Sequence, residues 1–200
     1  MRNGTSGREA RRAALCCALF LFFVSIHAAA QAQSERSYQE LPRFHQINAQ
    51  LFRGAQPRDG GLQRLAALGI RTVINLRGRS DDARREEQEA QGLGLNYFQM
   101  PMSGLRRPTK VQVTNALNII NAPENWPVFV HCRRGIDRTG MVIASYRVTH
   151  DGWTAERASR EANTFDLRLW FKIGLESYIN DFIEHRPRPS PMQTAVAGNL

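Results

Sequence analysis

One stretch of the chain combines residues that could carry out nucleophilic chemistry on a phosphate group. Between Val128 and Tyr146 the sequence reads VFVHCRRGIDRTGMVIASY, and Cys132 is the only cysteine outside the N-terminal apolar run. Five residues separate Cys132 from Arg138. A loop of that length can curl so that its backbone N–H groups point inward, and such a loop at a helix N-terminus binds anions. The stretch therefore predicts an anion site with a thiol at its base.

The residue types of this loop suggest a different chemical role for each residue. A helix N-terminus and nearby cations lower the pKa of a thiol, so we expect Cys132 to be a thiolate nucleophile at neutral pH. Arg138 can donate two hydrogen bonds to two phosphoryl oxygens. Thr139 can donate its hydroxyl to the sulfur and ease its later departure, and Gly135 permits a backbone conformation that a side chain would hinder. We expect His131 to anchor the loop through backbone contacts rather than to act as a base.

Alternating short elements must position this loop. Two short strands are expected within 44–57, around Asn48, and further strands within 70–78, 95–102 and 127–130. Helices are expected over 60–69, 81–92, 108–120 (capped by Thr109) and 139–150, and two more should start near Thr154 and Leu169. In the last of these, four apolar residues recur at helical spacing: Phe171, Leu175, Tyr178 and Phe182.

This alternation predicts an α/β fold. We expect a single domain over 38–186, with a central, mostly parallel sheet flanked by helices on both faces. The phosphate loop should lie between a central strand and a buried helix. Ligands of such sheets bind beyond the carboxyl ends of the strands, which is where Cys132 falls in the sequence.

Composition limits the classes of partner. The 200 residues carry a formal net charge of +9, and +6 remains without residues 1–32. That balance favours anionic partners, although the excess of arginine over lysine would also follow from a GC-rich genome. The positive charge is the only feature of the sequence that would support nucleic-acid binding. Aromatic and basic residues are not interleaved, so we expect no nucleic-acid partner. Cys132 has no second cysteine or histidine cluster with which to form a zinc site.

The two ends of the chain are expected to lie outside the domain. Arginines precede the apolar run AALCCALFLFFVSIHAAA, and the AQA at Ala30 to Ala32 fits a cleavage site. Residues 1–32 are therefore expected to be a signal peptide for export to the periplasm or beyond. An uncleaved membrane anchor is the alternative, and it would be the only membrane contact. The proline-broken stretch 187–200 is expected to be a disordered tail.

The segment HCRRGIDRTG resembles the signature of the cysteine-dependent protein tyrosine and dual-specificity phosphatases. LFRGAQP, LGIRTVINLR, MPMSG and HDGWTAERA are similar to segments of bacterial, plant and fungal atypical dual-specificity phosphatases, over 44–182. The resemblance implies a phosphocysteine intermediate with Cys132 as nucleophile, Arg138 as phosphate clamp and Thr139 as assistant. It also implies that loop amides hold the phosphoryl oxygens, and that no metal or other cofactor takes part. The expected substrate-binding residues are His131, Arg133, Arg134, Gly135 and Ile136.

One departure from the family pattern concerns the general acid. These phosphatases usually carry an aspartate on the loop after the strand that corresponds to LNYFQM, but here that loop reads PMSGLRRPT. Asp137, inside the phosphate loop, is the nearest substitute, and it could instead tie the loop to a neighbouring arginine. The further candidates, which could equally be helix caps or solvated charges, are Asp81, Asp82 and Asp166.

Several functions stay open from the sequence. The main one is phosphomonoester hydrolysis on a phosphorylated protein or small molecule. Five basic residues could ring the pocket or simply form a solvated face: Arg106, Arg107, Lys110, Arg133 and Arg134. If they ring it, phosphoinositides or inositol (poly)phosphates become plausible substrates. Two other classes fit less well. An inactive phosphate-binding module would usually have lost the cysteine or the arginine, and this chain keeps both Cys132 and Arg138. A sulfurtransferase also places a cysteine in a loop after a strand, but the Arg138-Thr139 ending fits phosphate better.

Overall fold

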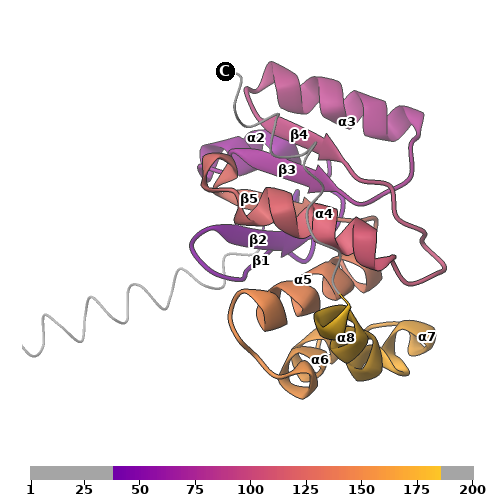
Figure 1. Ribbon diagram of the computed structural model, residues 1–200. Coiled ribbons are helices and arrows are strands. Elements are labelled where there is room, and N and C mark those ends of the chain that lie inside the picture. The colour runs from indigo at the N-terminus through magenta and orange to yellow at the C-terminus, as the bar shows by residue number, and fades with distance from the viewer. Residues whose placement is uncertain (1–37, 186–200) are drawn as a thin grey trace, which may run out of the picture. The chain divides into compact units, whose positions relative to one another are not determined.

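A five-stranded sheet organises the part of the chain that the computed structural model describes, residues 38–185 (Figure 1). Its strands are β1 (His45–Gln46), β2 (Leu51–Gly54), β3 (Thr72–Asn75), β4 (Asn96–Gln99) and β5 (Val128–His131). Their order across the sheet is β1-β2-β5-β3-β4, in which β1 is antiparallel to β2 and the other neighbours are parallel. The predicted α/β fold is confirmed, and β5, which precedes the phosphate loop, is central.

Helices cover both faces of the sheet, as predicted. The helical segments are α2 (Gly61–Ala67), α3 (Asp81–Gly92), α4 (Lys110–Asn121), the 3-10 turn η2 (Pro123–Asn125), α5 (Asp137–Thr149), α6 (Ala155–Asn163), α7 (Leu169–Lys172) and α8 (Leu175–Glu184). In Figure 1, α4 and α5 lie on one side of the sheet, with α6, α7 and α8 beyond α5. The opposite face packs its apolar residues against α2 and α3.

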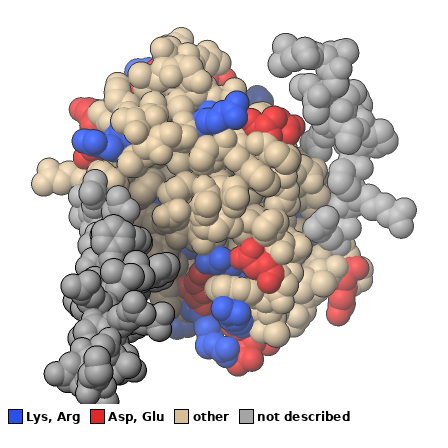
Figure 2. All heavy atoms as spheres, turned by 90° about the vertical axis from the view of Figure 1, so that its left-hand side faces the viewer, with Lys and Arg blue, Asp and Glu red and all other residues tan. Residues whose placement is uncertain are grey.

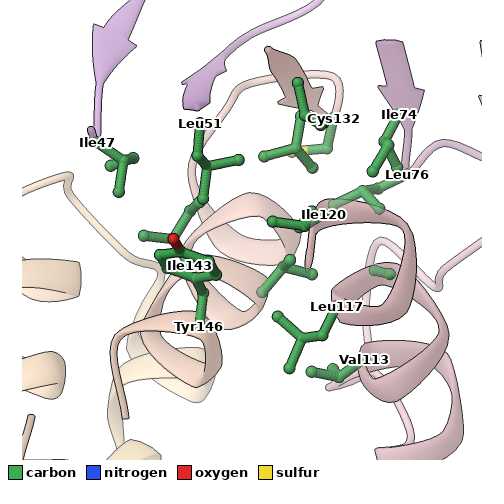
Figure 3. Packing of buried hydrophobic residues seen from close by; sticks show 14 of the residues in the cluster. Ile47, Leu51, Ile74, Leu76, Val113, Leu117, Ile120, Cys132, Ile143 and Tyr146 are labelled. Atoms are coloured by element: carbon green, nitrogen blue, oxygen red, sulfur yellow. The ribbon is translucent and has the colours of Figure 1, made fainter. Parts of the chain in front are cut away.

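The alternation of side chains along β5 divides the core in two. Val128 and Val130 belong to a cluster with residues of α4 and α5, whereas Phe129 packs on the opposite face. Figure 3 shows the first cluster, in which Leu117 of α4 and Ile143 of α5 lie below the ends of the strands. All four residues of β5 are buried, as expected of a strand covered on both faces.

Side-chain caps explain where several helices begin. Thr109 forms a capping box at the start of α4, because its hydroxyl accepts from Gln112 N and the Gln112 side chain accepts from Thr109 N. Ser80 and Thr154 accept equivalent hydrogen bonds at the starts of α3 and α6. The predicted cap at Thr109 and the predicted start near Thr154 are both confirmed.

The helix that was predicted to start near Leu169 is two helices. Gly174 has a φ of +67°, a left-handed conformation that ends the first segment, and α8 begins at the next residue. Phe171 belongs to α7, whereas Leu175 and Phe182 belong to α8. The apolar spacing continued across this break, so periodicity alone could not show it.

Charges of both signs are interspersed on the face that Figure 2 presents. Acidic and basic side chains lie next to one another near its lower and upper edges, with uncharged side chains between them. No helix within 38–185 is both long and apolar enough to cross a membrane. The expected signal peptide and tail lie outside the described residues, so cleavage, export and tail disorder stay predictions.

The packing of α4 on the sheet predicts a large difference between two substitutions on that helix. Leu117 is 2% exposed in the core, whereas Val111 is 54% exposed. Leu117→Ala should lower the free energy of unfolding by about 2–5 kcal/mol, because it removes buried methyl groups and leaves a cavity. Val111→Ala should change it by less than about 0.5 kcal/mol. Urea unfolding of both variants measures the difference, and equal losses would contradict this packing.

Candidate active site

Cys132 directly follows the central strand, and α5 begins five residues later at Asp137. Its side chain is 2% exposed, and it lies at the strand end above the apolar residues of α4 and α5 (Figure 3). The strand, the loop and the helix therefore occupy the places that the sequence predicted for a nucleophile at the base of an anion site.

The surroundings of Cys132 favour the thiolate. Burial alone would raise the pKa of the thiol. The hydroxyl and backbone N–H of Thr139, the charge of Arg138 and the backbone N–H of Arg134 outweigh burial and hold the pKa below its usual value. The Thr139 hydroxyl is buried and makes no hydrogen bond to any nitrogen or oxygen atom of the described residues. Its lowering of the pKa of Cys132 fits the expectation that Thr139 assists the thiolate.

The loop closes against β2 at Gly135. Its φ is +67°, and a Cβ atom at this position would lie 2.4 Å from the carbonyl oxygen of Gly54. Both the backbone conformation and the close approach therefore require glycine here. Ile136, which precedes α5, is buried beneath the loop with residues of α6 and α8.

Arg138 lies where the carboxyl ends of the strands meet. Its Nη1 donates to the carbonyl of Leu76, after β3, at 3.1 Å and to that of Met102, after β4, at 3.5 Å. Two loops thus hold the guanidinium beside the thiol, and the side chain is only partly buried. This geometry suits the predicted phosphate clamp, since the fork is oriented before an anion arrives.

His131 points to the other face of the sheet, where a buried carboxylate meets it. His131 Nε2 lies 3.0 Å from Glu86 Oε1 of α3, and both side chains are almost fully buried. Burial would raise the pKa of Glu86, but the contact with His131 and hydrogen bonds from neighbours such as Tyr97 lower it overall. Asn75 Nδ2 donates to the second carboxylate oxygen at 2.6 Å.

Glu86 was missed by the sequence reading. The signal that could have found it is its position three residues after Ala83 and four before Ala90, on the single buried stripe of an otherwise polar helix. A carboxylate on such a stripe needs a buried partner.

Asp137 is bound to arginines. The Nε of Arg168 donates to Oδ2 at 2.6 Å and the backbone N–H of Arg168 donates to Oδ1 at 3.0 Å. Arg134 Nη2 adds a contact to Oδ2 at 3.3 Å. Arg168 also donates to the carbonyl of Gly104 and so joins the start of α5 to the loop after β4. The sequence analysis left open that Asp137 ties the loop to a neighbouring arginine, without naming that arginine. In the structure, Asp137 makes such contacts with Arg168 and Arg134.

The other three candidate acids lie at the surface with arginine partners. Asp81 and Asp82 are in the first turn of α3, where they pair with Arg84 and Arg85 one turn later. Asp166 is 82% exposed, and its carboxylate is 3.7 Å from Arg43. Within residues 38–185, no group of three or more histidine, cysteine or carboxylate side chains is arranged to hold a metal ion.

The five basic residues proposed to ring the pocket are arranged unequally. Lys110 Nζ lies 2.6 Å from Asp181 of α8, and Arg107 donates to the carbonyl of Trp170 at 3.2 Å. Arg106, Arg133 and Arg134 are exposed. Arg133 and Arg134 belong to the loop itself, so they remain the best placed to meet a larger anionic substrate.

The contact between Thr139 and the thiolate predicts a shift in cysteine reactivity. Thr139→Val removes the hydroxyl at nearly constant volume, so the pKa of Cys132 should rise and its alkylation curve should move to higher pH. Iodoacetamide labelling across a pH series, read at the Cys132 peptide by mass spectrometry, measures this. Ser145→Ala is the control, because it also removes a buried hydroxyl from α5, one that has no hydrogen-bond partner within residues 38–185. An unchanged curve for Thr139→Val would refute the contact.

Comparison with known proteins agrees with this geometry. Residues 25–169 match a family model described as "DSP-PTPase phosphatase fused to NAD+ Kinase". The dual specificity protein phosphatase TpbA of Pseudomonas aeruginosa is 29% identical over 125 residues, which are 59% of this chain and 52% of that protein. Inositol diphosphatase SIW14 of Saccharomyces cerevisiae is 38% identical over 58 residues, 27% of this chain and 21% of that protein. The chain spans about half the length of the first of these relatives.

Solved structures share the fold. The catalytic core of the PP-IP phosphatase SIW14 from S. cerevisiae superimposes with a TM-score of 0.60 at 23% identity, covering 74% of this chain and 92% of that one. TpbA of P. aeruginosa gives a TM-score of 0.59 at 21% identity, with 70% and 88% covered. The family match spans most of the chain and includes the whole loop from Cys132 to Arg138. The chain therefore belongs to the DSP-PTPase phosphatase family.

Proposed function

We propose that this protein hydrolyses phosphate monoesters through a phosphocysteine intermediate. The Cys132 sulfur attacks phosphorus, and the bond between phosphorus and the ester oxygen breaks with its electron pair on the departing oxygen. A water molecule then attacks phosphorus, the sulfur–phosphorus bond breaks, and orthophosphate and the thiolate are released. The sulfur leaves as a thiolate, and its hydrogen bond from Thr139 stabilises that leaving group.

The observation that carries this proposal is the setting of Cys132. A buried thiol has its pKa lowered by backbone amides, a hydroxyl and the guanidinium of Arg138, at the start of a helix. The same donors are placed to stabilise the charge of a transferring phosphoryl group. The rest of the substrate is suggested by the relatives: TpbA is named a dual specificity protein phosphatase, and one solved structure of it holds phosphotyrosine. A phosphorylated protein is therefore the first candidate substrate.

A phosphorylated inositol is the second candidate, and a specific observation favours it. The loop at 101–109 holds no carboxyl group, and Asp137 already accepts hydrogen bonds from two arginines. A leaving group that needs no proton suits such a site. The phosphate ester that departs when sulfur attacks the terminal phosphorus of a diphosphate is such a group. Four relatives are named inositol diphosphatases, and a solved structure of similar fold, PTPMT1, is a complex with PI(5)P. The exposed Arg133 and Arg134 would meet the added charge.

The nucleophile is tested by one substitution. Cys132→Ser should abolish hydrolysis of an aryl phosphate while orthophosphate still binds, because the loop amides and Arg138 remain. Turnover assays and calorimetric titration with orthophosphate measure the two properties. A Cys16→Ser, Cys17→Ser double variant is the control and should keep wild-type turnover. Residual turnover in Cys132→Ser, or loss of wild-type activity in a chelator, would exclude the proposed mechanism.

The role of Asp137 is tested by comparing leaving groups. The acid role predicts that Asp137→Asn slows an alkyl phosphate by about 10²–10⁴-fold and a nitrophenyl phosphate much less. Because Asp137 is bound to Arg168 and Arg134, we expect instead similar losses on both substrates together with weaker orthophosphate binding. Measurement of kcat/KM on the two esters decides between the roles. Asp166→Asn, an exposed carboxylate, is the control and should change neither rate. A loss confined to the alkyl ester would restore the acid role.

A further inference from the structure

Arg53 is fully buried beside the phosphate loop, and the mechanism above does not use it. It belongs to β2, where it pairs in register with Val130 of β5, so its side chain points to the face of the sheet that α5 covers. It is the largest fully buried side chain in the described part of the protein. A guanidinium in such a place requires an explanation, because burying a charge is costly unless partners compensate it.

Arg53 contacts the phosphate loop. Arg53 Nη2 donates to the carbonyl oxygen of Gly135 at 2.8 Å, and its Cζ lies 3.7 Å from the centre of the Phe165 ring. No carboxylate within residues 38–185 forms an ion pair with it, and Nε and Nη1 have no hydrogen-bond partner there. Its single polar partner is therefore a backbone carbonyl of the loop that surrounds the nucleophile.

The geometry of the peptide unit gives this contact a consequence. In a trans peptide the carbonyl of one residue and the N–H of the next point in opposite directions. When Arg53 holds the Gly135 carbonyl toward β2, the N–H of Ile136 must point away from β2, toward the interior of the loop. An amide pointing inward is a donor for a phosphoryl oxygen.

In a second peptide unit of the same loop, the carbonyl is also held by the end of β2 and the following N–H points the other way. The backbone N–H of Gln56, just after β2, donates to the carbonyl of Arg133 at 3.4 Å. The N–H that follows in this peptide belongs to Arg134, and it is among the groups that lower the pKa of Cys132. Two alternate carbonyls of the loop are thus held by the end of β2, and in the second case the paired N–H acts on the nucleophile.

We infer that Arg53 is a positioning residue of the phosphate-binding loop: it holds the Gly135 carbonyl outward, so that the Ile136 N–H is aimed at the phosphoryl group. The inference rests on the proposed phosphatase function, because it concerns the anion that this function brings to the loop. Close packing keeps the arrangement in place. Phe165 covers the guanidinium, and Gly135 touches the backbone of β2 where a Cβ would not fit.

The charge of Arg53 adds to this role. Burial lowers its pKa to about 10, so it remains a cation at neutral pH, and the negative charge of Cys132 is among the groups that favour that cation. Glu161 also favours the cation, whereas the charges of Arg147 and Arg43 oppose it. Arg138 is the other cation that acts on the thiol. The cation therefore supports the anionic form of the nucleophile as well as the shape of the loop.

The test uses the full chain with Arg53→Met, which removes charge and donors at similar length, and Arg53→Lys, which keeps the charge but not the fork. Arg53→Met should lower kcat/KM for an aryl phosphate by roughly 10²-fold, as loss of one oriented amide donor does. It should also weaken vanadate binding and move Cys132 alkylation to higher pH. Arg53→Lys should lie between Arg53→Met and the wild type in all three measurements.

Arg147→Met is the control, because Arg147 is a largely buried arginine on α5 whose hydrogen bonds go to Glu161 and Asp151 and not to the phosphate loop. It should lower Tm yet keep kcat/KM and vanadate affinity within about twofold. If both Arg53 variants behave like Arg147→Met, the inference is overturned; if Arg53→Met does not fold, Arg53→Lys decides alone by the same criterion. The proposed function is judged separately, by wild-type turnover and its loss in Cys132→Ser.

Discussion

The structure depends on one electrostatic constraint: a buried thiol has to lose its proton more readily than burial alone allows. Cys132 is 2% exposed, and a buried thiol would ordinarily hold its proton. The groups that outweigh burial and hold the pKa of this thiol below its usual value are close in sequence: one hydroxyl, one guanidinium and two backbone N–H groups. These donors act only from particular directions. The loop must therefore have a single shape before any substrate arrives, which is the preorganisation that phosphoryl transfer exploits.

That shape is enforced from several sides. The end of β2 holds two loop carbonyls through Arg53 and Gln56, and Arg168 ties the first residue of α5 to the loop after β4. On the far face of the sheet, Glu86 meets His131, the residue before the nucleophile. Each support comes from a different element, and the carboxyl ends of four parallel strands bring them to one edge. A central strand is the position from which one loop can reach all of them.

The sequence predicted the local parts of this arrangement and missed the distant ones. The loop and the Thr109 cap depend on neighbours within a few positions, so residue types and spacing were sufficient. Gly135 was recognised as a loop glycine, whereas its close approach to Gly54 depends on the fold. Arg53, Glu86 and Arg168 meet the loop from separations of 82, 45 and 31 residues, and each looked like one more charge in a charged chain. Burial distinguishes Arg53 and Glu86, while Arg168 is only partly buried. The burial of a charged residue is settled by tertiary packing. The break at Gly174 was hidden for a related reason, since apolar spacing continued across it.

The same network bears on the leaving group. Asp137 is the carboxyl residue nearest to Cys132 in the sequence. Both of its carboxylate oxygens, however, accept hydrogen bonds from Arg168 or Arg134. Donating a proton would require those bonds to be rearranged in each turnover, and the loop would lose a support at the moment when its shape matters. In the proposed mechanism, positive charge acts on the phosphoryl group and the substrate itself stabilises the departing oxygen. Hydrolysis should then be fastest for groups that leave as stable anions, and diphosphates and aryl esters are of that kind.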